Sequence, residues 1–141
     1  MYRGPILFPL ILVVFGFLLL FSNLGYIQRL AGRYEEAIAS DRTVLSLSPG
    51  RGSTHYLLAV ALLLKGDGSG ALAEIEQETS ELWRMIGLPM AYHALGRKAD
   101  ADTALAALAA KYAKDAPSNI AAVHAFRGQA DEAFRWLDKA V

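Results

Sequence analysis

Hydrophobic and polar positions follow two different patterns along the chain. From Ile6 to Phe21 the sequence is almost continuously apolar, and 14 of these 16 residues are Leu, Ile, Val or Phe. Further on, apolar positions recur at the three- and four-residue spacing of amphipathic helices, interrupted at intervals by glycine. The pattern therefore predicts one apolar helix followed by a series of amphipathic helices.

Four of the glycines mark an internal repeat. Gly32, Gly66, Gly96 and Gly128 lie 34, 30 and 32 residues apart, which is a period typical of stacked helical units. Five positions after each glycine comes a small residue, where a second helix would lie close against the first. These small residues are Ala37, Ala71, Ala101 and Ala133. Each unit is therefore predicted to be two helices, A and B, joined by a glycine turn.

The first unit, from Leu24 to Pro49, resembles the tetratricopeptide repeat. It carries Leu24-Gly25 in helix A, the run GRYEEAI around the turn, and Pro49 at its end. The resemblance covers roughly residues 18–141 and implies an all-α fold, an α-solenoid of about four helical hairpins preceded by one long apolar helix. We expect residues 1–28 to form that apolar helix and residues 18–141 the repeat domain, with no flexible linker between them.

Three residues depart from the family's pattern. Asp41 stands where helix B usually has a large apolar residue, and Glu78 where it usually has a small one. Pro89 lies within helix A of the third unit. Because proline disrupts the interior of a helix, we expect this helix to begin at Gly87 or Leu88, or to kink there.

The second unit contains further local signals. Ser53 is expected to cap a helix over residues 54–65, and a glycine-rich turn over residues 66–70 should precede a helix that begins at Ala71. This turn lacks the preceding strand and the following Lys-Ser/Thr of a phosphate-binding loop. A solvated acidic face is expected from Glu74, Glu76, Glu78 and Glu81.

The N-terminal apolar helix is long enough to cross a lipid bilayer. No charged residue occurs between Arg3 and Arg29, and a helix over residues 4–28 would span about 37 Å, against a hydrocarbon core of about 30 Å. Its apolar side chains favour insertion by roughly 4 to 8 kcal/mol. They are Ile6, Leu7, Phe8, Leu10, Ile11, Leu12, Val13, Val14, Phe15, Phe17, Leu18, Leu19, Leu20 and Phe21. The sequence therefore predicts a single-pass membrane protein in contact with lipid.

Two other interpretations of this helix stay open. A cleaved signal peptide has a shorter apolar core and a cleavage site of small residues, and no such site is clear here. Alternatively, the helices of several chains could bundle in the core of a protein assembly. The chain would then be a structural subunit of a homopolymeric filament, extracellular or on the cell surface, or of a membrane complex, with the repeats outside.

Composition narrows the classes of function. The chain has 14 basic and 14 acidic residues and no cysteine, which disfavours nucleic-acid binding and excludes disulfides and thiolate metal sites. His55, His93 and His124 belong to different units and do not form an i, i+4 pair, so no metal centre is expected. The sequence shows no catalytic motif and no cofactor fingerprint. We therefore expect neither an enzyme nor a bound cofactor.

Other proteins are the expected partners. Helices A should present an apolar and aromatic groove on the inner side of the solenoid, and the open C-terminal end should offer a second surface. By helical phase the groove is predicted to contain Tyr56, Val60, Trp83, Ile86, Met90, His93 and Phe126, and the C-terminal surface Phe134 and Trp136. In a homo-oligomer, the C-terminal surface would meet the next protomer head to tail.

Overall fold

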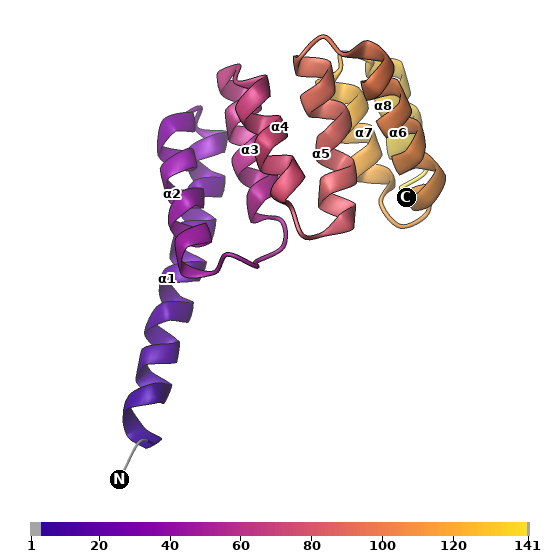
Figure 1. The fold of residues 1–141 in the computed structure, drawn as a ribbon. Coiled ribbons are helices and arrows are strands. Elements are labelled where there is room, and N and C mark those ends of the chain that lie inside the picture. Colours follow the sequence, from indigo (N-terminus) through magenta and orange to yellow (C-terminus); the bar gives the residue numbers. More distant parts are fainter. Residues whose placement is uncertain (1–3, 141) are drawn as a thin grey trace.

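The fold was analysed in a computed structural model that describes the backbone of residues 4–140 and the side chains of residues 10–140 (Figure 1). Residues 4–140 form eight α-helices and no strand. The helices are α1 (Gly4–Leu30), α2 (Tyr34–Leu47), α3 (Thr54–Lys65), α4 (Gly68–Gln77), α5 (Glu81–Ala94), α6 (Lys98–Tyr112), α7 (Pro117–Phe126) and α8 (Ala130–Asp138). The predicted all-α fold is confirmed.

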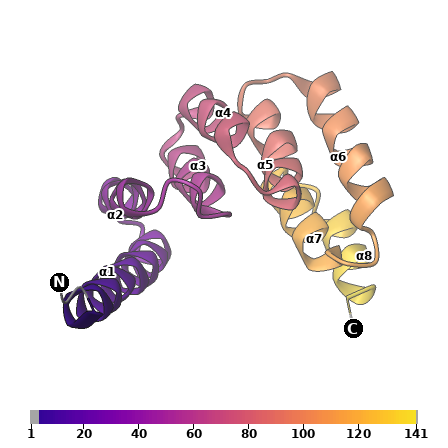
Figure 2. The same ribbon diagram turned by 60° about the horizontal axis from the view of Figure 1, so that its bottom comes forward.

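The helices pair into four hairpins that stack along the chain. Each hairpin joins a helix A to the following helix B, as α1 with α2, α3 with α4, α5 with α6, and α7 with α8. Successive hairpins pack helix B against the next helix A, and α5 also contacts both α3 and α7. Figures 1 and 2 show the hairpins following one another from indigo to yellow, with α1 extending beyond the stack.

Glycine makes the turn inside every hairpin. Gly32, Gly66, Gly96 and Gly128 have φ angles of +73°, +92°, +71° and +74°, a left-handed conformation that glycine adopts without steric cost. The alanines five positions later are buried, with at most 7% of the surface of each exposed. The repeat frame predicted from the sequence is therefore confirmed.

Close packing explains why α5 tolerates its proline. The helix begins at Glu81 and runs through Pro89 to Ala94, so the prediction of a start near Gly87 was wrong. A Cβ atom on Gly87 would lie only 2.1 Å from the Cδ1 atom of Ile75 on α4. Pro89 is itself buried, and the packing of this helix among its neighbours outweighs one missing backbone hydrogen bond.

The start of α3 depends on a carboxylate from the residue that follows α4. Ser53 has a φ angle of +74° and its side chain caps nothing. Instead, the Glu78 carboxylate accepts hydrogen bonds from the backbone N–H groups of Ser53, Tyr56 and Ser80, at 3.2, 3.1 and 2.9 Å. Glu78 is only 1% exposed. Its predicted place on a solvated face, and the predicted cap by Ser53, were both wrong.

The second hairpin turn is also shorter than predicted. Helix α4 begins at Gly68, three residues before Ala71. The Asp67 carboxylate accepts a hydrogen bond from the backbone N–H of Gly70 at 2.7 Å. This bond caps the helix and stabilises its first turn despite two glycines.

Replacing Glu78 with alanine is expected to lower the free energy of unfolding by about 2 to 3 kcal/mol, because three backbone N–H groups lose a charged acceptor. Urea unfolding followed by far-UV circular dichroism measures the change. The matched control is Glu76→Ala, since Glu76 is exposed near the end of α4, two residues before Glu78, and its loss should change stability by less than about 0.5 kcal/mol. Equal effects of the two substitutions would contradict the capping role.

Candidate functional site

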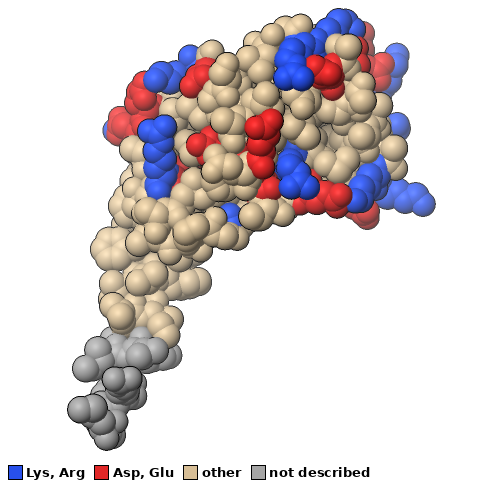
Figure 3. All heavy atoms as spheres, viewed as in Figure 1, with Lys and Arg blue, Asp and Glu red and all other residues tan. Residues whose placement is uncertain are grey.

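The N-terminal half of α1 is an exposed apolar rod. Leu10, Phe15 and Leu20 are 59%, 55% and 58% exposed, and the described side chains of this part carry no charge (Figure 3). The helix contains one candidate membrane span, Leu10–Leu30, of 21 residues with a mean hydropathy of 2.3. By length and composition alone, α1 is therefore long enough and apolar enough to cross a membrane.

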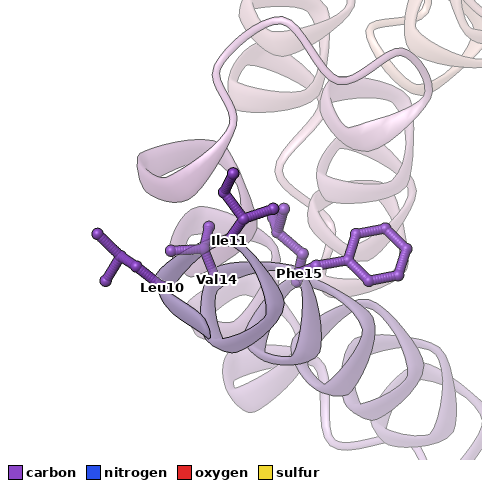
Figure 4. A pocket seen from close by; sticks show the side chains of 5 residues that line it. Leu10, Ile11, Val14 and Phe15 are labelled. Carbon is purple, nitrogen blue, oxygen red and sulfur yellow. The ribbon is translucent and has the colours of Figure 1, made fainter. Parts of the chain in front are cut away.

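The predicted lipid-facing residues occupy all sides of this rod. Leu10, Ile11, Val14, Phe15 and Leu18 line a hollow of about 320 Å³, and Figure 4 shows the labelled side chains projecting from α1. Because the lining comes from one helix, the hollow is an open surface rather than an enclosed ligand pocket. Leu12, Val13, Phe17 and Leu19 are also exposed, whereas Leu18 and Phe21 are half-buried. The side chains of Ile6, Leu7 and Phe8 lie outside the described part of the chain.

A buried polar junction joins α1 to the solenoid. The guanidinium of Arg29 donates to the carboxylate of Asp41 on α2, and the two side chains are only 7% and 2% exposed. Beside this pair, the hydroxyl of Ser40 donates to the side-chain oxygen of Gln28 at 2.8 Å. A Cβ atom on Gly25 would lie 2.8 Å from a carboxylate oxygen of Asp41, so the helices approach closely only with glycine there.

Electrostatics at this junction follow from burial. Desolvation raises the pKa of Asp41 from 3.8 to about 6, and the neighbouring Arg29 offsets only part of that rise. At neutral pH the carboxylate is ionised and paired with the guanidinium. The junction thus holds α1 against α2 at the point where the apolar rod enters the solenoid.

Aromatic pairs connect successive helices A. Tyr56 on α3 stacks on Trp83 of α5 with ring centroids 5.0 Å apart, and His93 on α5 meets the edge of Phe126 of α7 at 6.1 Å. With Val60, which is half-buried, these side chains form what we call the helix A face. These predicted groove residues thus form two separate pairs, and Tyr56, Trp83 and Phe126 are partly buried against the core.

Two predicted groove residues belong to the core instead. Ile86 is 0% exposed and Met90 is 6% exposed, so neither side chain is available at the surface. Both are part of the hydrophobic cluster that runs through the solenoid. Their prediction as surface residues was wrong because the packed helices turn this side of α5 inward.

Next to the helix A face, which includes His93, lies a hollow that the sequence did not indicate. It measures about 310 Å³ and is lined by His93, Gly96, Lys98, Arg127 and Gln129. Lys98 and Arg127 both donate to Asp102, which holds the pKa of that carboxyl near 2. Both cations are thus already paired.

The three histidines make separate contacts. His55 Nδ1 lies 2.8 Å from a carboxylate oxygen of Glu74, and His124 Nδ1 lies 2.9 Å from the side-chain oxygen of Gln129. Among the described residues, no group of three or more His, Asp or Glu side chains is placed to hold a metal ion.

The outer face of α8 exposes apolar side chains. Phe134 and Leu137 are 66% and 44% exposed, and they border a hollow of about 290 Å³. Trp136 is half-buried against the core, with the Lys139 ammonium 3.9 Å from the centre of its ring. Of the two residues predicted at this end, only Phe134 is strongly exposed.

Comparison with known proteins agrees with this architecture. The tetratricopeptide repeat family model matches residues 52–77 and 119–139, which include α3 with α4 and most of α7 with α8. No match was found among the curated proteins. The second and fourth hairpins correspond to the matched segments, and the other two have the same turn glycine and the same buried alanine. The chain is therefore an all-α solenoid of tetratricopeptide-like hairpins that begins with one long apolar helix.

Proposed function

We propose that the chain is a membrane-anchored scaffold or accessory subunit that binds other proteins through its repeats. The observation that carries this proposal is the course of α1, whose exposed apolar half continues without a break into a half fixed to α2. Residues 1–28 would act as the single-pass anchor and residues 18–141 as the binding domain. Residues 18–28 belong to both parts and lie within the single helix α1, so the anchor would be joined rigidly to the binding domain.

Burial on α1 supports a boundary near Phe21. From Gly4 to Phe21 a helix spans about 27 Å, close to the hydrocarbon thickness of a bilayer. Further along, Gln28 and Arg29 are buried against α2, so they would lie outside the lipid together with the hairpin they contact. Lipid would then cover the side chains that the solenoid leaves exposed.

The repeats supply the surface for partners. Tetratricopeptide repeats suggest protein–protein interaction, and Tyr56, Trp83 and Phe126 are residues of the type that dominates interface energetics. Tyr56 and Trp83 are held by stacking on each other and Phe126 by an edge contact with His93, so little side-chain entropy would be lost on binding. An apolar or aromatic segment of another protein would fit the helix A face.

A second candidate is a structural subunit of a filament or membrane complex. The exposed residues of α1 would then be covered by α1 helices of other copies instead of by lipid. Exposure of Phe134 and Leu137 at the other end of the chain favours contact between copies. This candidate differs from the first in what surrounds α1.

A photocrosslinking benzoylphenylalanine placed at Trp83 or Phe126 is expected to form covalent adducts with a partner protein in native membranes. The same group at Ala106, which is exposed on α6, serves as the matched control and should give at least about tenfold less adduct. Mass-shifted bands on a denaturing gel measure the yield. Equal yields at all three positions would contradict a partner site on the helix A face.

A further inference from the structure

Successive hairpins pack through one recurring interface. Helix B of each hairpin lies against helix A of the next, as in α2 with α3, α4 with α5, and α6 with α7. In the second of these contacts, Ile75 of α4 sits directly against Gly87 of α5. Ile75 follows the repeat alanine by four positions, and Gly87 precedes the repeat glycine by nine.

Helix α8 exposes the face that the other helices B bury. At four positions after the repeat alanine, Ile75 and Leu105 are 0% and 7% exposed, whereas Asp41 in the first hairpin is buried against α1 of its own hairpin. Leu137 occupies this position in α8 and is 44% exposed, and Phe134, one turn earlier, is 66% exposed. Within the described residues, nothing covers this face.

Helix α1 exposes the matching face at the other end. At five positions before the turn glycine, Ala61, Ala91 and Val123 are each 0% exposed. Ile27 occupies this position in α1 and is 60% exposed, and Tyr26 beside it is 57% exposed. Each end of the solenoid thus presents one half of the interface that holds its interior together.

We propose that two copies of this chain dock end to end, with the exposed face of α8 in one copy receiving the exposed face of α1 in the next. This inference rests on the proposed function in that the repeat surfaces bind protein, and the partner it names is a second copy of the chain. The contacts between hairpins inside the chain supply the register. Leu137 has the same position in its repeat as Ile75, and Asn23 the same position as Gly87, so the Ile75–Gly87 contact predicts that Leu137 of one copy meets Asn23 of the next.

The chemistry of the two faces is compatible with this register. Asn23 is small and uncharged. In the contact between α6 and α7 an asparagine, Asn119, already occupies the same repeat position, and Leu105, the equivalent of Leu137, is buried there. Ile27 and Tyr26 would bury apolar surface against Phe134 and Leu137. Because the two faces differ, the contact is heterologous, and each dimer keeps one free face at either end for further copies.

The test uses two variants of the full chain purified in detergent, each with one damaged face. Ile27→Glu damages the face on α1, and Leu137→Glu damages the face on α8. Analytical ultracentrifugation at several protein concentrations, with micelles in excess, measures association of each variant alone and of the two mixed in equal amounts. Leu64→Glu is the matched control, because Leu64 is 45% exposed but lies in the middle of the solenoid.

The expected result is specific to a heterologous contact. The wild-type chain and Leu64→Glu form dimers and larger species as concentration rises, whereas each face variant alone associates at least about tenfold more weakly. The mixture forms dimers and nothing larger, because it contains one intact α8 face and one intact α1 face per pair. Unchanged helicity in far-UV circular dichroism shows that the variants are folded.

Other results would overturn the inference. Wild-type chains that stay monomeric would exclude pairing, even if another protein occupied either face. Oligomers that persist in both single variants would assign association to the apolar part of α1, and a mixture that stays monomeric would exclude a heterologous contact. Each result is distinct from failure of the proposed membrane anchor, because the need for detergent is measured separately on the wild-type chain.

Discussion

Replacing both Val14 and Leu18 with arginine is expected to release the chain from membranes. Each arginine near the centre of a membrane helix costs about 2.5 to 3.5 kcal/mol on the insertion scale and removes a favourable apolar residue. Two substitutions therefore cancel the roughly 4 to 8 kcal/mol that favours insertion of this helix. The fraction of protein that stays in the membrane pellet after carbonate extraction measures the loss.

The control for this experiment carries the same two charges elsewhere. Leu47 and Leu64 are 40% and 45% exposed on the solenoid, so Leu47→Arg with Leu64→Arg adds equal charge without touching α1. This control should remain in the pellet. A Val14→Arg, Leu18→Arg variant that is folded and still resists carbonate would contradict anchoring by α1.

Replacing Arg29 with methionine is expected to lower the free energy of unfolding by about 3 to 5 kcal/mol at pH 7.5. The reason is that Asp41, whose side chain is 2% exposed, would lose its partner, so the folded chain would have to hold a buried unpaired carboxylate or take up a proton at pH 7.5, and both cost stability. Urea unfolding of the full chain in detergent measures the change. The double variant Arg29→Met, Asp41→Leu removes both charges and should regain most of the lost stability, and a double variant as unstable as the single one would contradict this explanation.

The pH dependence of stability gives an independent view of the same junction. Asp41 has a pKa of about 6 in the folded chain against an ordinary value of 3.8, so the folded state binds the proton more readily than the unfolded state. The stability of the wild type relative to Asp41→Asn should therefore rise by about 3 kcal/mol as pH falls from above 6 to below 4. That gain disappears again as pH rises through 6. Parallel unfolding curves at pH 4 and pH 7.5 would show it.

The repeat frame could be predicted from the sequence because it depends on local conformation. Each turn between helices A and B needs a left-handed residue, and glycine meets that need at Gly32, Gly66, Gly96 and Gly128. The helix over residues 54–65 was predicted with the bounds it has in the structure. Period, turn chemistry and apolar spacing all point to the same hairpins, which makes such predictions reliable.

The buried polar groups could not be predicted in the same way. Asp41 and Glu78 were recognised as departures from the family's pattern, but their roles depend on partners in other helices. Asp41 pairs with Arg29 of α1, and Glu78 binds the N–H groups at the start of α3. A carboxylate in a sequence does not reveal whether it will find such donors, and exposure is the usual outcome.

Surface and core positions were the other source of error. Helical spacing placed Met90 and His93 on one side of α5, yet Met90 is 6% exposed while His93 lies at the surface. The rotation of a helix against two neighbours decides this difference, and it is set by contacts such as that of Ile75 with Gly87. Comparing equal positions in the four units would have drawn attention to Ile27 and Leu137, whose equivalents are buried.

Sedimentation of the full-length chain with and without detergent tests membrane anchoring most directly. A lipid anchor predicts that the protein stays a small particle only in detergent and precipitates or joins vesicles when detergent is removed. A regular polymer that forms and stays soluble in detergent-free buffer would show that Leu10 to Leu20 are buried against copies of themselves. That result would contradict the membrane anchor and make the chain a subunit of a filament.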